Sequence, residues 1–224
     1  MTNSEFLQKL DETIECDSLL KHPFYQLWNE GRLTQKSLAE YAKQYYAHVK
    51  AFPTYLSGVH SHCEDFSVRQ LLLENLMDEE LGKENHPELW KRFAMGLGVE
   101  CEEIESAEIL TETQESVSTL KQLTQNEDFI NGVAALYAYE SQVPEIAKTK
   151  REGLAKFYGI DDSRTVAYFT VHETADVKHS DAERSILTKY CTTEETQKQV
   201  IDSAEKSAKA MWTFLDGVYE NYVN

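Results

Sequence analysis

The stretch SRTVAYFTVHETADVKHSDAERSILTKY, residues 163–190, decides the fold class. It contains neither Gly nor Pro, the two residues that most often interrupt a helix. Its apolar side chains recur at the three- and four-residue spacing of a helix that buries one face. The stretch therefore predicts one long helix. Similar spacing runs through almost the whole chain without sustained strand-type alternation, so we expect an all-α protein.

The rest of the chain carries start and stop signals for further helices. Capping-box spacing at Thr192-x-x-Glu195 predicts the start of the last helix. Asp128 is the expected N-cap of an apolar segment, FINGVAALYAYESQVPEIA, which we expect Pro144 to bend. Seven or eight helices with short connections predict a compact bundle, in which metal and cofactor sites lie between the inward faces of several helices.

The composition narrows the classes of protein to which this chain can belong. Its 224 residues suit one domain, residues 1–224, and 41% hydrophobic with 27% charged residues is typical of a globular protein. The net charge of −17 disfavours binding to nucleic acid through a basic face. No apolar run approaches the length of a membrane span, and the four cysteines lie far apart, which together favour a protein of the reducing cytoplasm.

Polar residues on the apolar face of residues 163–190 are the first candidates for a functional site. At about 100° per residue, His172, Asp176 and His179 fall within a sector of about 60° that also holds core-facing apolar side chains. The two histidines lie about 10.5 Å apart along the helix axis, which leaves room for a pair of metal ions with Asp176 between them. The alternative is a partly exposed helix end with polar residues there by coincidence.

Two further segments place ionisable groups near apolar surroundings. Glu140 lies in VAALYAYESQV, which is apolar on nearly every side, so a cation, a hydrogen bond or a metal ion must neutralise it. His86 follows Glu79 by two helical turns, but Pro87 disfavours a continuous helix between them. Periodicity does not decide between Glu79 and Glu80, and a charged helix end accounts for this segment equally well.

Together the three segments offer three carboxylates and three histidines, which suits a pair of iron or manganese ions. Oxygen and imidazole donors match these metals, whereas a structural zinc site more often uses thiolates and stops at four ligands. Three carboxylates would offset much of the charge of two divalent cations, and the cations would remove the cost of burying them. The ferritin-type Glu-x-x-His pair is absent, because Lys83 stands three residues before His86, so the scaffold must be another helical one.

Long strings spread over nearly the whole chain resemble one known family. They are HPFYQLW (22–28), LAEYAKQYYAHVKAFPTYLSGVHSHC (38–63), LLLENLMDEE (71–80), GVAALYAYESQVPEIA (132–147) and YFTVHETADVKH (168–179). The family is the one named for the Chlamydia protein associating with death domains. The resemblance implies a heme-oxygenase-like bundle related to TenA-type proteins and pyrroloquinoline quinone synthase. It also implies a dimetal oxidase whose metal ligands are Glu79, His86, Glu140, His172, Asp176 and His179.

The resemblance also implies an activity. The family is associated with an O2-dependent synthesis of 4-aminobenzoate for folate, in which a tyrosine of the protein is the carbon source and a lysine donates the amino group. The matching residues of this chain are Tyr25, Tyr41, Tyr139 and Tyr168, with Lys150 as the amino donor. The implied cofactors are two metal ions, Fe/Fe or Fe/Mn, with O2 as co-substrate and an electron donor as partner.

Two other functions stay open from the sequence. A TenA-like enzyme of cofactor metabolism would use a cysteine nucleophile and no metal. A host death-domain interaction protein would bind a basic partner on its acidic surface. Such a role would require secretion into a host, which the sequence leaves open. A homodimer is also compatible with the sequence. Replacing His172 or Glu140 with Ala discriminates, because an oxidase then loses metal and product whereas a binding protein keeps its partner.

Overall fold

The computed structural model describes residues 1–125 and 128–223, and this part of the chain folds into helices without a strand, as the all-α prediction requires. The helices are α1 (Asn3–Cys16), α2 (Pro23–Asn29), α3 (Gln35–His62), α4 (Phe66–Glu80), α5 (His86–Gly96), α6 (Cys101–Glu105), α7 (Thr111–Thr124), α8 (Phe129–Glu140), α9 (Val143–Gly153), α10 (Ala167–Tyr190) and α11 (Glu194–Tyr222). A 3-10 turn, Leu19–Lys21, precedes α2, and a π-helical turn, Leu154–Tyr158, follows α9. Among these described helices, none has both the length and the hydropathy of a membrane span.

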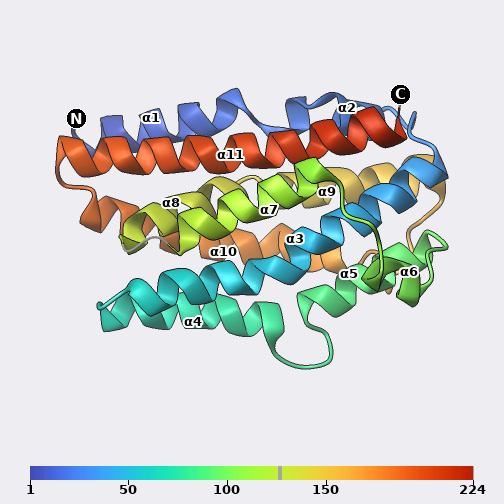
Figure 1. Ribbon diagram of the computed structural model, residues 1–224, viewed down its shortest axis with the longest axis horizontal. Coiled ribbons are helices and arrows are strands. Elements are labelled where there is room, and N and C mark those ends of the chain that lie inside the picture. Colours follow the sequence, from blue (N-terminus) through green and yellow to red (C-terminus); the bar gives the residue numbers. More distant parts are fainter. Residues whose placement is uncertain (126–127, 224) are drawn as a thin grey trace.

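The long helices α3, α10 and α11 organise the bundle (Figure 1). α11 runs along the molecule beside α1 and packs against α7 and α8. α10 packs against α8 and α9 and also contacts α4 and α5. Since α4, α5 and α8 carry the other predicted ligand residues, the inward face of α10 is the one surface on which all the predicted ligands can meet.

The apolar segment after Asp128 breaks where the sequence predicted a bend. Asp128 caps α8 by accepting a hydrogen bond from the Ile130 amide, as expected. α8 ends at Glu140, and α9 begins at Val143 with Pro144 in its first turn. Proline is favoured there because first-turn amides have no partner inside the helix, so the chain starts a new helix. The break leaves Glu140 at the carboxyl end of α8.

Glu79 and His86 belong to two separate helices, as the proline after His86 indicated. The chain leaves α4 after Glu80 and enters α5 at His86. Gly82 has a φ of 87° in the connecting loop, a left-handed conformation that glycine adopts without steric cost. Glu79 is buried and Glu80 is exposed, so the structure distinguishes two residues that periodicity could not.

The last helix starts one residue later than predicted. Its capping box is formed by Thr193 and Thr196, and the expected box of Thr192 and Glu195 is wrong. Glu194 and Glu195 fall instead in the first helical turn. Acidic side chains are favourable at that position because the amino end of a helix carries partial positive charge.

Aromatic side chains fill the core next to α10. Trp90 of α5 has its ring centroid 4.6 Å from that of Tyr45 and 4.7 Å from that of Tyr168. Its indole N–H donates to the Ala42 carbonyl at 2.8 Å. Aromatic pairs of this kind contribute about 0.5–1.5 kcal/mol each beyond the area that they bury. They hold the rings of α3 and α10 in place on one side of the predicted metal ligands.

Candidate metal centre

Helix α10 presents His172, Asp176 and His179 to the core, as their spacing predicted. The three side chains are 4%, 2% and 5% exposed, respectively. Imidazoles and carboxylates are seldom buried without partners, so the groups that face them from neighbouring helices decide what they do.

His172 joins Glu79 and His86 in a first cluster, which we call the Glu79 group. Glu79 Oε1 lies 2.8 Å from His86 Nδ1, and the ring centroids of His86 and His172 are 4.2 Å apart. One candidate ligand atom from each of the three side chains lies within 4.8 Å of the others. A metal ion placed among them would meet one carboxylate and two imidazoles.

Asp176 and His179 join Glu140 in a second cluster, the Glu140 group. His179 Nδ1 lies 3.4 Å from Glu140 Oε1 and 3.5 Å from Asp176 Oδ1. The candidate ligand atoms of this group also lie within 4.8 Å of one another. Asp176 lines the same small cavity as Glu79 and Glu140, so it lies beside both clusters.

Hydrogen bonds orient the candidate ligands. Nδ1 of His172 lies 2.7 Å from the Tyr168 carbonyl oxygen, which leaves Nε2 for the Glu79 group. Nε2 of His179 lies 3.2 Å from Asp78 Oδ2, which leaves Nδ1 for the Glu140 group. The Asn75 amide donates to Glu140 Oε1 at 2.9 Å. Metal-binding histidines are usually held in this way, with the second ring nitrogen on a carbonyl or carboxylate oxygen.

The electrostatics of the two groups fit a pair of metal ions. Burial, together with the neighbouring carboxylates, raises the pKa of Asp176 to about 7, and burial also raises the pKa of Glu79. Burial lowers the pKa of His172 well below its usual value. Burial also lowers the pKa of His179. The neighbouring carboxylates of Asp176 and Glu140 have the larger effect, however, and raise that pKa to about 10. Glu140 Oε2 and His179 Nδ1 are buried without a hydrogen bond, as ligand atoms that face a cation would be.

The predicted lysine and two of the predicted tyrosines meet in a second buried place. Tyr25 and Tyr41 lie with their hydroxyl oxygens 3.0 Å apart, and the Lys150 amine donates to the Tyr41 hydroxyl at 2.6 Å. Lys150 is 4% exposed and forms no ion pair with a described residue; its Nζ lies 4.7 Å from the centroid of the Tyr25 ring. Burial therefore holds the pKa of Lys150 well below its usual value.

The other two predicted tyrosines, Tyr139 and Tyr168, stand between the lysine and the two metal-ligand groups. Both line a small cavity of about 10 Å³ that also contacts side chains of the Glu79 and Glu140 groups. Both also line a cavity of about 20 Å³ next to Lys150. The Tyr168 ring stacks on that of His172 at a centroid distance of 4.0 Å. We call the second cavity the tyrosine–lysine cavity.

Three residues of this region were absent from the sequence prediction. Tyr45 forms a hydrogen bond with Tyr139, with 2.5 Å between the hydroxyl oxygens. It lies one turn after Tyr41 on α3, and this spacing is the signal that could have identified it as a site residue. Asn75 supports Glu140, and Glu183 is a buried carboxylate one turn after His179. Glu183 extends the predicted row of α10 and was detectable by the same periodicity.

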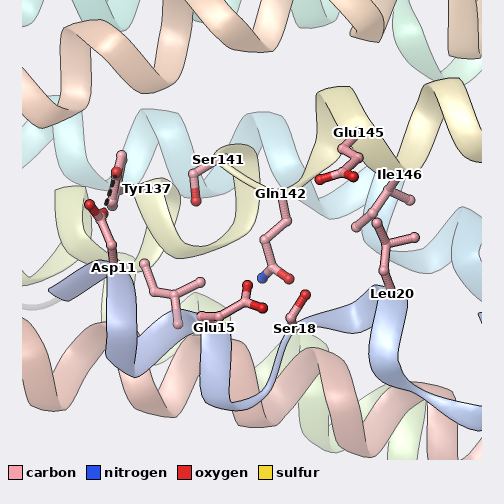
Figure 2. Close-up of a pocket in the computed structure, with 10 residues that line it drawn as sticks. Asp11, Glu15, Ser18, Leu20, Tyr137, Ser141, Gln142, Glu145 and Ile146 are labelled. Atoms are coloured by element: carbon pink, nitrogen blue, oxygen red, sulfur yellow. Dashed lines mark hydrogen bonds between the residues drawn. The ribbon is translucent and has the colours of Figure 1, made fainter. Parts of the chain in front are cut away.

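A larger pocket opens outside this region, between α1 and the turn that joins α8 and α9 (Figure 2). Its volume is about 240 Å³, and Gln142 reaches across it to accept a hydrogen bond from the Leu19 amide at 3.0 Å. Ile146 lines both this pocket and the tyrosine–lysine cavity. Part of the wall between the cavity and the pocket is therefore a single aliphatic side chain.

No cysteine lines the cavities of the described centre, which removes the basis for a cysteine-dependent hydrolase at this place. Cys63 and Cys191 are buried elsewhere, Cys101 is half-buried and Cys16 is exposed. Burial raises the pKa of the Cys63 thiol, which disfavours the thiolate that a nucleophile needs.

The fold is that of heme oxygenase. A domain from Shewanella denitrificans described as having a heme oxygenase-like fold superposes with a TM-score of 0.82 over 99% of this chain and 94% of that one, at 17% identity. That likeness concerns the architecture alone.

The family follows from the sequence. Residues 39–212 match the model of a family described as iron-containing redox enzymes, and this chain belongs to that family. The 4-aminobenzoate synthase of Nitrosomonas europaea is 46% identical over 99% of this chain and 94% of its own length. The 4-aminobenzoate synthase of Chlamydia muridarum is 42% identical over 96% of this chain and 90% of its own.

Proposed function

We propose that this protein is an O2-dependent 4-aminobenzoate synthase with two metal ions, one bound by the Glu79 group and one by the Glu140 group. The observation that carries the proposal is the pair of adjacent, buried ligand groups built from α4, α5, α8 and α10. Membership in the iron-containing redox enzymes and the names of the two relatives support the same reaction.

The donor set favours iron or manganese, as Fe/Fe or Fe/Mn. Hard carboxylate oxygens and borderline imidazole nitrogens suit these metals, and three carboxylates offset most of the charge of two divalent ions. When bound, the ions supply redox chemistry toward O2 that amino-acid side chains do not provide. The protein contributes the fixed positions of the ligands and a site closed to bulk water, and the reaction would draw its electrons from an external donor.

The tyrosine–lysine cavity supplies the organic part of the reaction in this proposal. Burial lowers the pKa of the Lys150 amine well below its usual value and so favours the neutral amine, which alone has the lone pair that bond formation to carbon requires. Its donor contact with Tyr41 and its position over the Tyr25 ring place the amine beside two candidate carbon sources. If one of these rings is consumed, each chain turns over once.

Metal analysis of protein purified without O2, followed by exposure to O2, tests the proposal. We expect two metal ions per chain, 4-aminobenzoate in solution after O2 is admitted, and a loss of intact mass that matches a tyrosine side chain together with the amino nitrogen of Lys150. Product formation at unchanged mass would identify an external substrate instead. A Glu140→Ala variant that keeps both ions and full product yield would contradict the proposed centre.

A further inference from the structure

Glu183 is a buried carboxylate that the proposed reaction does not use. It lies on α10 one turn after His179 and is 3% exposed. Neither of its carboxyl oxygens forms a hydrogen bond with a described group. Buried carboxylates are almost always paired, so this side chain needs either a proton or a cationic partner.

Oxygen atoms of the side chains around Glu183 also lack hydrogen-bond partners. Glu183 lines the same small pocket as Asn75, whose side chain contacts Glu140, and Oε2 of Glu140 also has no hydrogen bond with a described group. Asn75 uses its amide nitrogen on Glu140 Oε1, at 2.9 Å, and its Oδ1 has no donor. Four oxygen atoms from α4, α8 and α10 are therefore buried in this region without a hydrogen-bond partner among the described residues.

A pocket between α4 and α10 leads to these oxygens from the surface. Asn75, His179 and Glu183 line it, and its volume of about 20 Å³ admits one water molecule or one ion. Glu74 and Lys178 also line it; they form an exposed ion pair at 3.2 Å. The pocket therefore extends from charged surface residues to the outer side of the Glu140 group.

A shared proton and a cation are the two ways to neutralise facing carboxylates. A proton between Glu140 and Glu183 would satisfy those two groups but would leave Asn75 Oδ1 unpaired. A cation satisfies the carboxylates and the amide oxygen together, because all of them are hard oxygen donors.

We propose that Asn75, Glu140 and Glu183 form an outer site for a divalent cation, through which metal ions pass from the surface to the Glu140 group. This inference rests on the proposed metal centre. Glu140 belongs to both places, so an ion can exchange the ligands of one for those of the other while it stays bound to that carboxylate. The outer site lacks an imidazole and opens to a water-sized pocket, so it binds its ion more weakly than the centre does.

Titration of metal-free protein with Mn²⁺ under argon tests this proposal, with free Mn²⁺ followed by its electron paramagnetic resonance signal. We expect three ions per chain in the wild type, the third the weakest. Glu183→Gln keeps the shape of the side chain and should bind only two, with filling of the centre slowed by about 10–100-fold, the range found when groups around a metal site are replaced. Asp181→Asn, the same charge change on the exposed side of α10, should behave like the wild type.

The outcomes separate this proposal from the one on which it rests. A wild type that binds two ions, with Glu183→Gln filling at the same rate, overturns the outer site and favours the shared proton, since the glutamine amide can donate to Glu140 in its place. A folded Glu183→Gln variant that binds no Mn²⁺ would make Glu183 part of the centre itself. A wild type that binds no metal would overturn the proposed function as well. If Glu183→Gln fails to fold, the Asn75→Asp variant tests the proposal instead. It adds a charged oxygen and should raise the affinity for the third ion about tenfold. An unchanged affinity for that ion would contradict the proposal.

Discussion

The two ligand groups and the tyrosine–lysine cavity lie on opposite sides of Tyr139 and Tyr168. They differ in how their buried ionisable groups are compensated. On one side, three carboxylates and three imidazoles converge in the two ligand groups, and no Lys or Arg is among the described residues that line the cavity beside them. On the other side, the amine of Lys150 is surrounded by aromatic rings and a hydroxyl group, without a carboxylate. The first region is arranged to be neutralised by ions from outside the chain, whereas burial in the second disfavours the charged form of its lysine amine.

This difference predicts that metal binding and product formation can be separated by mutation. Substitutions on the carboxylate side should affect both, whereas substitutions on the lysine side should affect the product alone. Four experiments, in order of decreasing expected effect, test how far the two regions are independent.

Asp176→Asn should have the largest effect, because the Asp176 carboxylate lies close to both ligand groups and asparagine keeps its size but not its charge. We expect the loss of at least one metal ion and a fall in product of more than about 100-fold, beyond what replacement of groups around a metal site costs. Metal content per chain and product yield measure the two effects. Two ions at wild-type affinity in this variant would show that Asp176 is not a ligand.

Lys150→Met should abolish the product and leave both metal ions in place. The variant should also be more stable than the wild type at neutral pH, because it no longer buries an amine at a cost. The pKa of Lys150 in the folded state is well below that in the unfolded state, so the unfolded chain binds a proton that the folded chain lacks. Wild-type stability therefore rises with pH toward the ordinary lysine pKa of about 10.4, and the variant should lack this rise.

Thermal unfolding at several pH values measures this stability difference, with about 2–4 °C of midpoint shift for each kcal/mol in a chain of this size. Lys148→Met, which removes an exposed lysine of the same helix, is the control. If Lys150→Met lost metal, the two regions would not be independent.

Metal affinity should rise with pH by up to tenfold per unit for each proton displaced. Without metal at neutral pH, His179 with a pKa of about 10 is protonated and Asp176 with a pKa of about 7 is about half protonated. An ion must displace those protons, so Mn²⁺ should bind more tightly from about pH 6 to about pH 9. Calorimetry in two buffers of different ionisation heat counts the protons released, and a pH-independent affinity would contradict the ligand roles of both residues.

Tyr45→Phe should have the smallest effect, a fall in product of about 2- to 10-fold, as expected for the loss of one hydrogen bond. The variant removes the hydroxyl that holds Tyr139 but keeps the ring that packs on Trp90. Tyr55→Phe is the matched control. Tyr55 lies on the same helix as Tyr45, and its hydroxyl donates a hydrogen bond to the Val117 carbonyl of α7. Equal product yields from the two variants would show that the orientation of Tyr139 does not matter.

The part of the site that the sequence predicted from the residues themselves lies on one helix. His172, Asp176 and His179 share a face through helical geometry alone, so spacing was sufficient to group them. The pairing of Glu79 with His86 depends on the loop between α4 and α5, and the positions of residues across a loop do not follow from periodicity. The sequence offered His86 with either Glu79 or Glu80 as candidate ligands, and the family resemblance chose Glu79. The tyrosines and Lys150 entered the prediction through that resemblance.

The residues that the sequence did not reveal act across long distances in the chain. Asn75 meets Glu140 only because α4 and α8 each pack against α3. A neutral amide in an acidic helix carries no sign of that contact. The break at Pro144 was foreseen only as a bend, since a proline that kinks a helix and one that starts a new helix look alike until the preceding turn is placed.

The helix break that leaves Glu140 as the last residue of α8 has a further consequence. A helix carries about half a negative elementary charge at its carboxyl end, so α8 directs its dipole at the Glu140 group and adds to the repulsion there. A bound cation would instead be attracted by the negative end of α8 and would stabilise the final turn of that helix. Depletion of metal should therefore let that turn fray, and amide hydrogen exchange at Tyr139 and Glu140 should accelerate before the rest of the bundle loosens.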